Sequence, residues 1–104
     1  MTRAVRFRPL ARDDVDNAIS WYGGERPALA LAFTESLDTV VARISETPLQ
    51  FPVVYGEVRR ALLGRFPYAV FFVLARDEVH VVAVVHLHRS PDTWKDRGST
   101  ETAG

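Results

Sequence analysis

The stretch "YAVFFVLARDEVHVVAVVHLH", residues 68–88, contains the longest unbroken apolar run of the chain and decides the fold. β-Branched and aromatic side chains dominate it, which is typical of strands. We therefore expect one strand over residues 68–75, a second over residues 79–87, and a short hairpin turn at 76–78. Apolar residues occupy both the odd and the even positions of these strands, so we expect both faces of the strands to be covered.

Two further strands are expected upstream of this stretch. Residues 58–63 carry the strand pattern again, and "AVRFR" at 4–8 alternates apolar and basic residues as a strand with one buried face would. Pro9 prevents the first strand from continuing as a central strand. Between them, "TPLQFPVVYG" at 47–56 holds two prolines and a glycine, so we expect a loop there.

Two helices are expected between the first strand and this loop. The first has apolar residues at helical spacing, namely Val15, Ala18, Ile19 and Tyr22. We place three carboxylates in its first turn, where the positive end of the helix dipole stabilises them; these are Asp13, Asp14 and Asp16. We expect Gly23-Gly24 to end it. The second runs from about Arg26 to Pro48, with the apolar stripe Ala30, Phe33, Leu37, Val40, Val41 and Ile44.

The resulting order, β-α-α-β-β-β, predicts an α+β fold. We expect a small, mainly antiparallel sheet of about four strands with an N-terminal helix hairpin packed on one face. The 104 residues suffice for one hydrophobic core but not two. We therefore expect a single domain over 1–97 and a flexible tail over 98–104, where "GSTETAG" has nothing to bury.

Composition excludes several classes of protein. The 13 basic and 13 acidic residues cancel, so overall charge does not indicate a nucleic-acid binder. The absence of cysteine rules out disulfides and thiolate metal sites and suits a reducing cytosol. The longest apolar run is too short to cross a bilayer, and the first residues lack an apolar signal region. We expect a cytoplasmic protein that neither spans nor binds a membrane.

Two histidines at the end of the last strand are candidates for chemistry. Strict alternation of side chains places His86 and His88 on one face, together with His80. The pair offers an acid and a base, but a metal site needs a third and a fourth ligand, which no motif supplies. We therefore predict no metal and no cofactor. The alternative is that backbone groups or a carboxylate satisfy these histidines at a strand end.

Arginines and a tryptophan supply candidate binding groups. Arg59 and Arg60 must point to opposite faces of their strand, so at most one of them shares a patch with Arg65. Such arginines either bind phosphate or form a solvated edge that discourages edge pairing. Trp94 follows Arg89 near the end of the chain; it either covers the core or serves as a stacking platform or protein anchor.

The ordered pattern resembles the RelE/ParE superfamily of type II toxins, often called plasmid-stabilisation proteins, over nearly the whole chain. The residues that carry the resemblance are "VRRALLGRFPYAVFF" at 58–72 and "VHVVAVVHLHRSPDTWKDR" at 79–97. "RFPY" at 65–68 and HxHRxPxxW at 86–94 are their most specific parts. The resemblance implies a bacterial toxin held inactive by a cognate antitoxin. ParE-like members poison DNA gyrase, whereas RelE-like members cut mRNA on the ribosome.

The sequence departs from the mRNA-cleaving branch. That branch gathers several lysines and arginines with a C-terminal tyrosine or histidine, whereas this chain has one lysine, Lys95, and its C-terminal aromatic residue is Trp94, which offers no acid or base. We therefore favour a non-enzymatic gyrase inhibitor without a small-molecule substrate.

The alternatives are a metal-independent endoribonuclease and a degenerate member that only binds its antitoxin. For the nuclease, the predicted catalytic residues are His86, His88, Arg65 and Arg89. For protein partners, the predicted binding residues are Arg59, Arg60 and Trp94.

Overall fold

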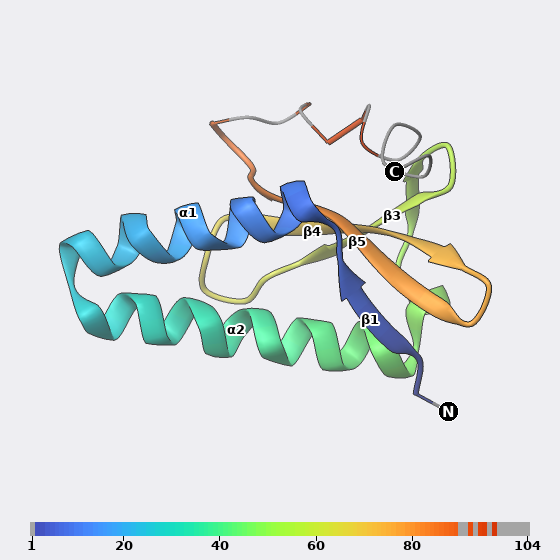
Figure 1. The fold of residues 1–104 in the computed structure, drawn as a ribbon, viewed down its shortest axis with the longest axis horizontal. Helices are drawn as coiled ribbons and strands as arrows, with labels where there is room; N and C mark the ends of the chain where they lie inside the picture. Colours follow the sequence, from blue (N-terminus) through green and yellow to red (C-terminus); the bar gives the residue numbers. More distant parts are fainter. Residues whose placement is uncertain (1, 90–91, 93, 96, 98–104) are drawn as a thin grey trace.

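The computed structural model describes residues 2–89, 92, 94, 95 and 97 and shows an α+β fold (Figure 1). Its elements are, in order, β1 (Ala4–Phe7), α1 (Pro9–Glu25), α2 (Pro27–Glu46), the short 3-10 helix η1 (Pro48–Gln50), β2 (Val53–Tyr55), β3 (Val58–Leu62), β4 (Tyr68–Ala75) and β5 (Glu78–His86). The predicted class, the helix hairpin and the four expected strands are confirmed, each strand end within one residue. The expected tail at 98–104 lies outside the described residues.

The sheet has five strands rather than the expected four. Their order is β1-β5-β4-β3-β2, with β1 parallel to β5 and the other pairs antiparallel. The additional strand, β2, lies within the segment expected to be a loop. Pro52 immediately precedes it, and Gly56, with a φ of 56°, turns the chain into β3. Proline is tolerated there because β2 is an edge strand, which has a neighbour on one side only.

The helix boundaries differ from the expected ones at both ends of α1. The helix begins at Pro9, so the three acidic residues at 13, 14 and 16 lie beyond its first turn. It also continues through Gly23-Gly24 to Glu25, and Arg26 alone separates it from α2. Arg26 is extended, with φ −156° and ψ 135°, because a residue that precedes proline avoids the helical region. Pro27, not the glycine pair, therefore sets the end of α1.

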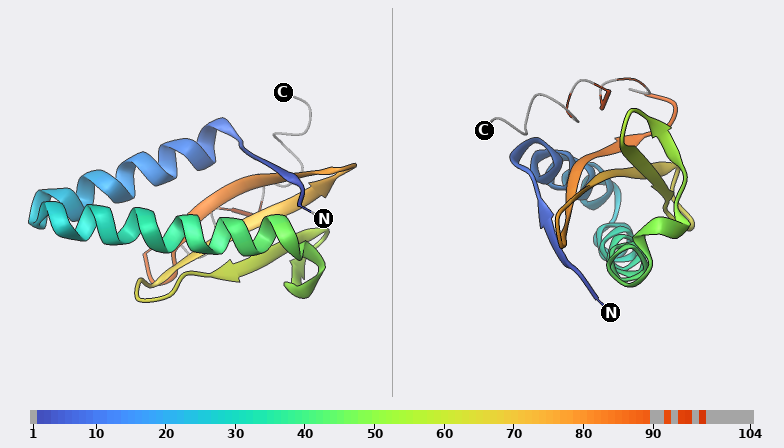
Figure 2. Two further views of the ribbon diagram at one scale, coloured as in Figure 1. Left: turned by 90° about the horizontal axis from the view of Figure 1, so that it is seen from below. Right: turned by 90° about the vertical axis from the view of Figure 1, so that its right-hand side faces the viewer.

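The two helices lie side by side on one face of the curved sheet (Figures 1 and 2). The core between them and the sheet includes the fully buried side chains of Phe33, Ile44, Val70, Phe72 and Val81. At one end of this core Phe33 packs against an aromatic cluster from three parts of the chain, namely Tyr22, Phe66 and Tyr68, with ring centroids 5.0 to 5.6 Å from its own.

The outer face of the sheet is buried as well, as the apolar runs predict. Phe71, Val82, Ala83 and Val85 form a second cluster there. Trp94 covers it, with its ring stacked on that of Phe71 at a centroid distance of 4.1 Å and an angle of 8°. Its side chain is 6% exposed, so the interpretation of Trp94 as a cover for the core is confirmed.

A β-bulge in β5 corrects the expected alternation of its side chains. Phe71 and Phe72 are adjacent in β4, but they pair with Ala83 and Val81, which leaves Val82 as the additional residue in β5. The additional residue shifts the alternation of side chains by one position. Two even-numbered residues of β5 therefore face opposite sides of the sheet when the bulge lies between them. His80 therefore lies on the outer face, opposite Val73, whereas His86 lies on the helix face, opposite Tyr68. The expectation that His80 shares a face with His86 is wrong.

Candidate functional site

Three of the predicted site residues gather where β5 ends beside α1. The backbone N–H of His88 donates a hydrogen bond to Nδ1 of His86 at 3.1 Å, and the two rings lie 5.8 Å apart. The guanidinium of Arg89 lies over the indole ring of Trp21, 4.7 Å from its centroid. His86, His88 and Arg89 thus form one rim, as the sequence predicts, and Trp21 of α1 joins it.

This rim opens into a cavity of about 350 Å³ between α1 and β5. The cavity walls include Asn17 and Trp21 from α1, Tyr68 from β4 and His86 from β5. Burial and, to a lesser extent, the charges of Arg89 and His88 lower the pKa of His86 below 6.5. These effects favour the neutral form of His86. Since its Nδ1 accepts the backbone bond, the ring proton is at Nε2, which is the available donor.

A carboxylate of α1, that of Asp14, lines one side of the cavity and binds a backbone N–H at the free edge of β5. β1 ends at Phe7, opposite Val81, so β5 has no strand neighbour on that side beyond this point. Asp14 accepts a hydrogen bond from the backbone N–H of Val84 at 2.9 Å and forms an ion pair with Arg97 at 2.6 Å. Arg97 in turn donates to the carbonyl of Val82. These contacts replace the missing strand.

The sequence interpretation did not include Trp21, Asp14 or Arg97 in the site. One signal for Trp21 was present in the sequence, because a tryptophan outside the apolar stripe of a helix is exposed, and Trp21 is 55% exposed. No local signal pairs Asp14 with Arg97, which follows it by 83 residues.

Arg65 lies apart from the histidine rim. It has a φ of 73° in the β3–β4 loop, and its guanidinium lies 6.0 Å from the ring centroid of Phe66. It lines a different cavity, together with Glu35 and Ser36 of α2. The structure therefore does not bring Arg65 together with His86 and Arg89.

The remaining predicted residues divide between the faces of the sheet. Arg59 pairs with Phe72 and donates to the carbonyl of Phe51 at 2.6 Å, whereas Arg60 pairs with Phe71 on the outer face. The expectation that these arginines point to opposite faces is confirmed. Arg60 and Trp94 thus share the outer face, and Arg59 does not.

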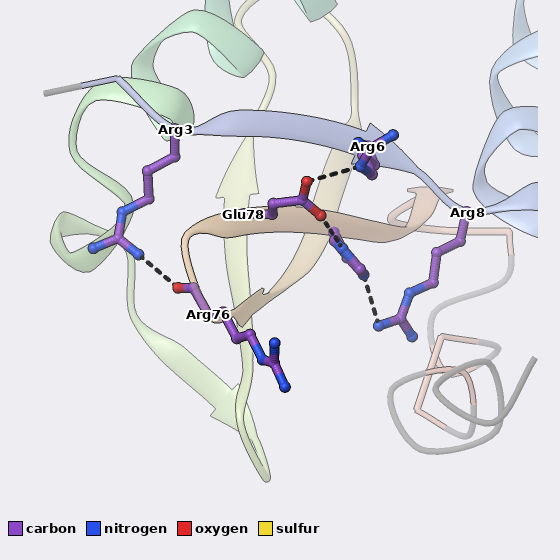
Figure 3. A network of polar contacts seen from close by, with 6 residues as sticks. Arg3, Arg6, Arg8, Arg76 and Glu78 are labelled. Atoms are coloured by element: carbon purple, nitrogen blue, oxygen red, sulfur yellow. Dashed lines mark hydrogen bonds and ion pairs between the residues drawn. The ribbon is translucent and has the colours of Figure 1, made fainter.

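A second polar network holds β1 to β5 on the outer face (Figure 3). Glu78 pairs with Arg6 at 2.9 Å and with Nε2 of His80 at 3.1 Å, and a nitrogen of Arg8 lies 3.2 Å from Nδ1 of His80. Hydrogen bonds from His80 and Arg6 lower the pKa of Glu78 below its ordinary value of 4.5. Arg8 is 9% exposed, and one of its terminal nitrogens is buried without a partner. We assign this network to the joining of the two strands.

Two further observations limit the chemistry of the described residues. Within them, no three histidine, aspartate or glutamate side chains gather in a way that would hold a metal ion. No helix in the described part of the chain is long and apolar enough to cross a membrane.

Comparison with known proteins points to one family. The family model described as "ParE toxin of type II toxin-antitoxin system, parDE" matches residues 5–91. A solved structure described as "Chromosomal ParDE TA system from P. aeruginosa" has a TM-score of 0.72 and 19% sequence identity, and the match covers 82% of this chain and 96% of that chain. This second likeness is one of fold. No curated protein matches the chain.

Proposed function

The chain belongs to the ParE toxin family of type II toxin–antitoxin systems, and we propose that it inhibits DNA gyrase by binding it and is neutralised by a cognate antitoxin. In this proposal the protein acts in the cytoplasm through protein interfaces, without metal, cofactor or small-molecule substrate. The family supplies the antitoxin partner, the resemblance to ParE-like members implies gyrase as the target, and the residues of this chain argue against the mRNA-cleaving alternative.

The separation of the predicted nuclease residues is the observation that carries the choice of gyrase. Cleavage of RNA at a phosphate needs a base, an acid and cations around one phosphate. Arg65 and His86 line different cavities. In addition, Nδ1 of His86 already accepts a hydrogen bond from the backbone. Trp94 is buried in the outer cluster, and its indole has no group that can act as an acid or a base.

The edge of the sheet at β2 supports a protein partner. β2 is an edge strand, and its Val53 and Tyr55 are each 50% exposed. Exposed apolar side chains on a strand with free backbone groups favour the addition of a partner strand. Arg60 lies on the adjoining outer face, so we keep it as a partner-binding candidate, and Arg59 as one from the helix face, whereas the buried Trp94 supports this surface from beneath.

Purified protein tests this proposal in a gyrase supercoiling assay. We expect inhibition of supercoiling, intact mRNA in a cell-free translation mixture, and relief of inhibition when the product of a neighbouring antitoxin gene is added. Arg60→Gln should weaken inhibition, whereas Arg12→Gln, on the exposed surface of α1, serves as the matched control. Unchanged supercoiling at a large excess of folded protein would contradict the proposal. Absence of growth arrest in cells would favour a degenerate member that only binds antitoxin.

One observation favours the ribosome-dependent endoribonuclease as a second candidate. His86, His88 and Arg89 do gather at one rim, where a neutral His86 acts as a general base once the backbone N–H of His88 releases its Nδ1. In this case mRNA in the translation mixture is cut, and His86→Ala or His88→Ala abolishes cutting. Cleavage that survives both substitutions would eliminate this candidate.

A further inference from the structure

Arg89 lies at the mouth of the cavity between α1 and β5. Two other arginines, Arg6 and Arg97, each have a carboxylate within ion-pair distance. Among the described residues Arg89 has none, and its contact is with the face of Trp21. An arginine stacked on an aromatic ring keeps its in-plane N–H groups available, so it is prepared for a planar anion.

Other donors line the same cavity. Nε2 of His86 carries its proton because Nδ1 accepts the backbone bond from His88. Tyr68 lines the cavity beside it, and burial raises the pKa of its hydroxyl above 10.0, so this group stays protonated. The donors of Arg89, His86 and Tyr68 thus belong to one cavity.

The positive charge of Arg89 acts across this cavity. It lowers the pKa of His86 and opposes the rise in the pKa of both Tyr22 and Tyr68. Asp14, the carboxylate among the residues that line the cavity, is already bonded to Val84 and Arg97. Among the described residues that line the cavity, Arg89 is therefore the cation without a carboxylate partner.

We propose that this cavity binds a single carboxylate, an aspartate or glutamate side chain of a protein partner, between Arg89 and His86 with Trp21 as one wall. The identity of the ligand follows from the surroundings. Asp13, Asp16 and Glu25 are exposed elsewhere on α1, and their negative charge disfavours a chain of phosphates more than a ligand with a single charge, for which one guanidinium suffices. Tryptophan and arginine are also the side chains that most often dominate protein interfaces. The inference that the carboxylate comes from a protein rests on the proposed function.

A titration of the full chain tests the site directly. The probe is N-acetyl-glutamate methylamide at pH 7.5 and constant ionic strength, followed by the NMR signals of the Trp21 indole N–H and the Arg89 Nε–H. We expect saturating shifts in the millimolar range. Arg89→Gln should weaken binding about tenfold or more, because it removes a charge-assisted pair. Arg12→Gln, a control on the exposed surface of α1, should leave binding unchanged.

Three parallel titrations decide the nature of the ligand. The neutral isostere N-acetyl-glutamine methylamide should give no saturation, and inorganic phosphate and uridine monophosphate should bind more weakly than the carboxylate. Equal binding of the isostere, equal binding by the Arg89→Gln variant, or tighter binding of a phosphate would each overturn the proposal. The titration uses the chain alone, so its result is independent of the gyrase assay, and each proposal can fail without the other.

Discussion

Asp14 offers a sharp test of how the free edge of β5 is stabilised. Its carboxylate accepts the backbone N–H of Val84 at 2.9 Å and pairs with Arg97 at 2.6 Å. Asp14→Ala removes both interactions and leaves the Val84 N–H and the Arg97 guanidinium without their acceptor. Asp14→Asn keeps an acceptor for Val84 but removes the charge that pairs with Arg97.

The expected loss follows from the burial of the pair. Hydrogen bonds to charged groups contribute about 1.5–3 kcal/mol, and breaking a fully buried pair costs about 3–5 kcal/mol. The side chains of Asp14 and Arg97 are 19% and 18% exposed, so a value toward the lower range applies. We expect Asp14→Ala to lower the free energy of unfolding by about 2.5 kcal/mol and Asp14→Asn by about 1.5 kcal/mol. The first corresponds to a fall in Tm of about 10 °C or more for a domain of this size.

Urea unfolding and hydrogen exchange measure these effects separately. The midpoint of unfolding reports global stability, and exchange of the Val84 amide reports the local bond. Asp13→Ala is the matched control, because Asp13 is exposed on the same helix and the change in helix propensity is the same. The reasoning is refuted if Asp14→Ala stays within about 0.5 kcal/mol of Asp13→Ala, or if the Val84 amide exchanges at the wild-type rate in that variant.

Three further predictions concern α1, the histidine rim and the β1–β5 network. Gly24→Ala should raise the free energy of unfolding by about 0.5–1 kcal/mol in urea, because Gly24 lies inside α1 and an added methyl group meets no heavy atom within 4 Å; a loss of stability would mean that the helix ends earlier. NMR titration of the His86 ring should give a pKa below 6.5 that rises in Arg89→Gln, and an unchanged value there would exclude the charge of Arg89 as a cause. Since the folded protein binds this proton more weakly than the unfolded chain, the contribution of His86 to stability is present above about pH 6.5 and declines as the pH falls below it. The pKa of Glu78 is lowered from 4.5, so its contribution to the free energy of unfolding is present above about pH 4.5 and is lost in acid. Glu78→Gln should therefore flatten the decline of the urea midpoint between pH 6 and pH 3, about the range where a glutamate titrates, and the control Glu35→Gln, at an exposed position, should not.

Errors at the helix and strand boundaries arose where two local signals competed. The glycine pair at 23–24 and Pro27 both indicate a helix end, and the proline prevailed because it excludes the helical conformation of the preceding residue, whereas glycine only weakens a helix. Prolines and a glycine around residues 53–55 likewise concealed β2. Proline is tolerated next to β2 because this strand lies at the edge of the sheet. The order of the strands in a sheet cannot be predicted from a few neighbouring residues.

Motifs at 58–72 and 79–97 carried a family resemblance that the family model confirms. The distribution of apolar residues along the chain was enough to determine the α+β class, the helix hairpin and three of the late strands within a residue. These properties depend on periodicity and order, which neighbouring residues carry. Only the tertiary structure decided which polar side chains meet. The bulge at Val82 separates His80 from His86, and the packing of α1 against β5 brings Asp14 to Arg97 across 83 residues. Such contacts depend on how strands pair and how a helix lies against them, and no local pattern specifies either.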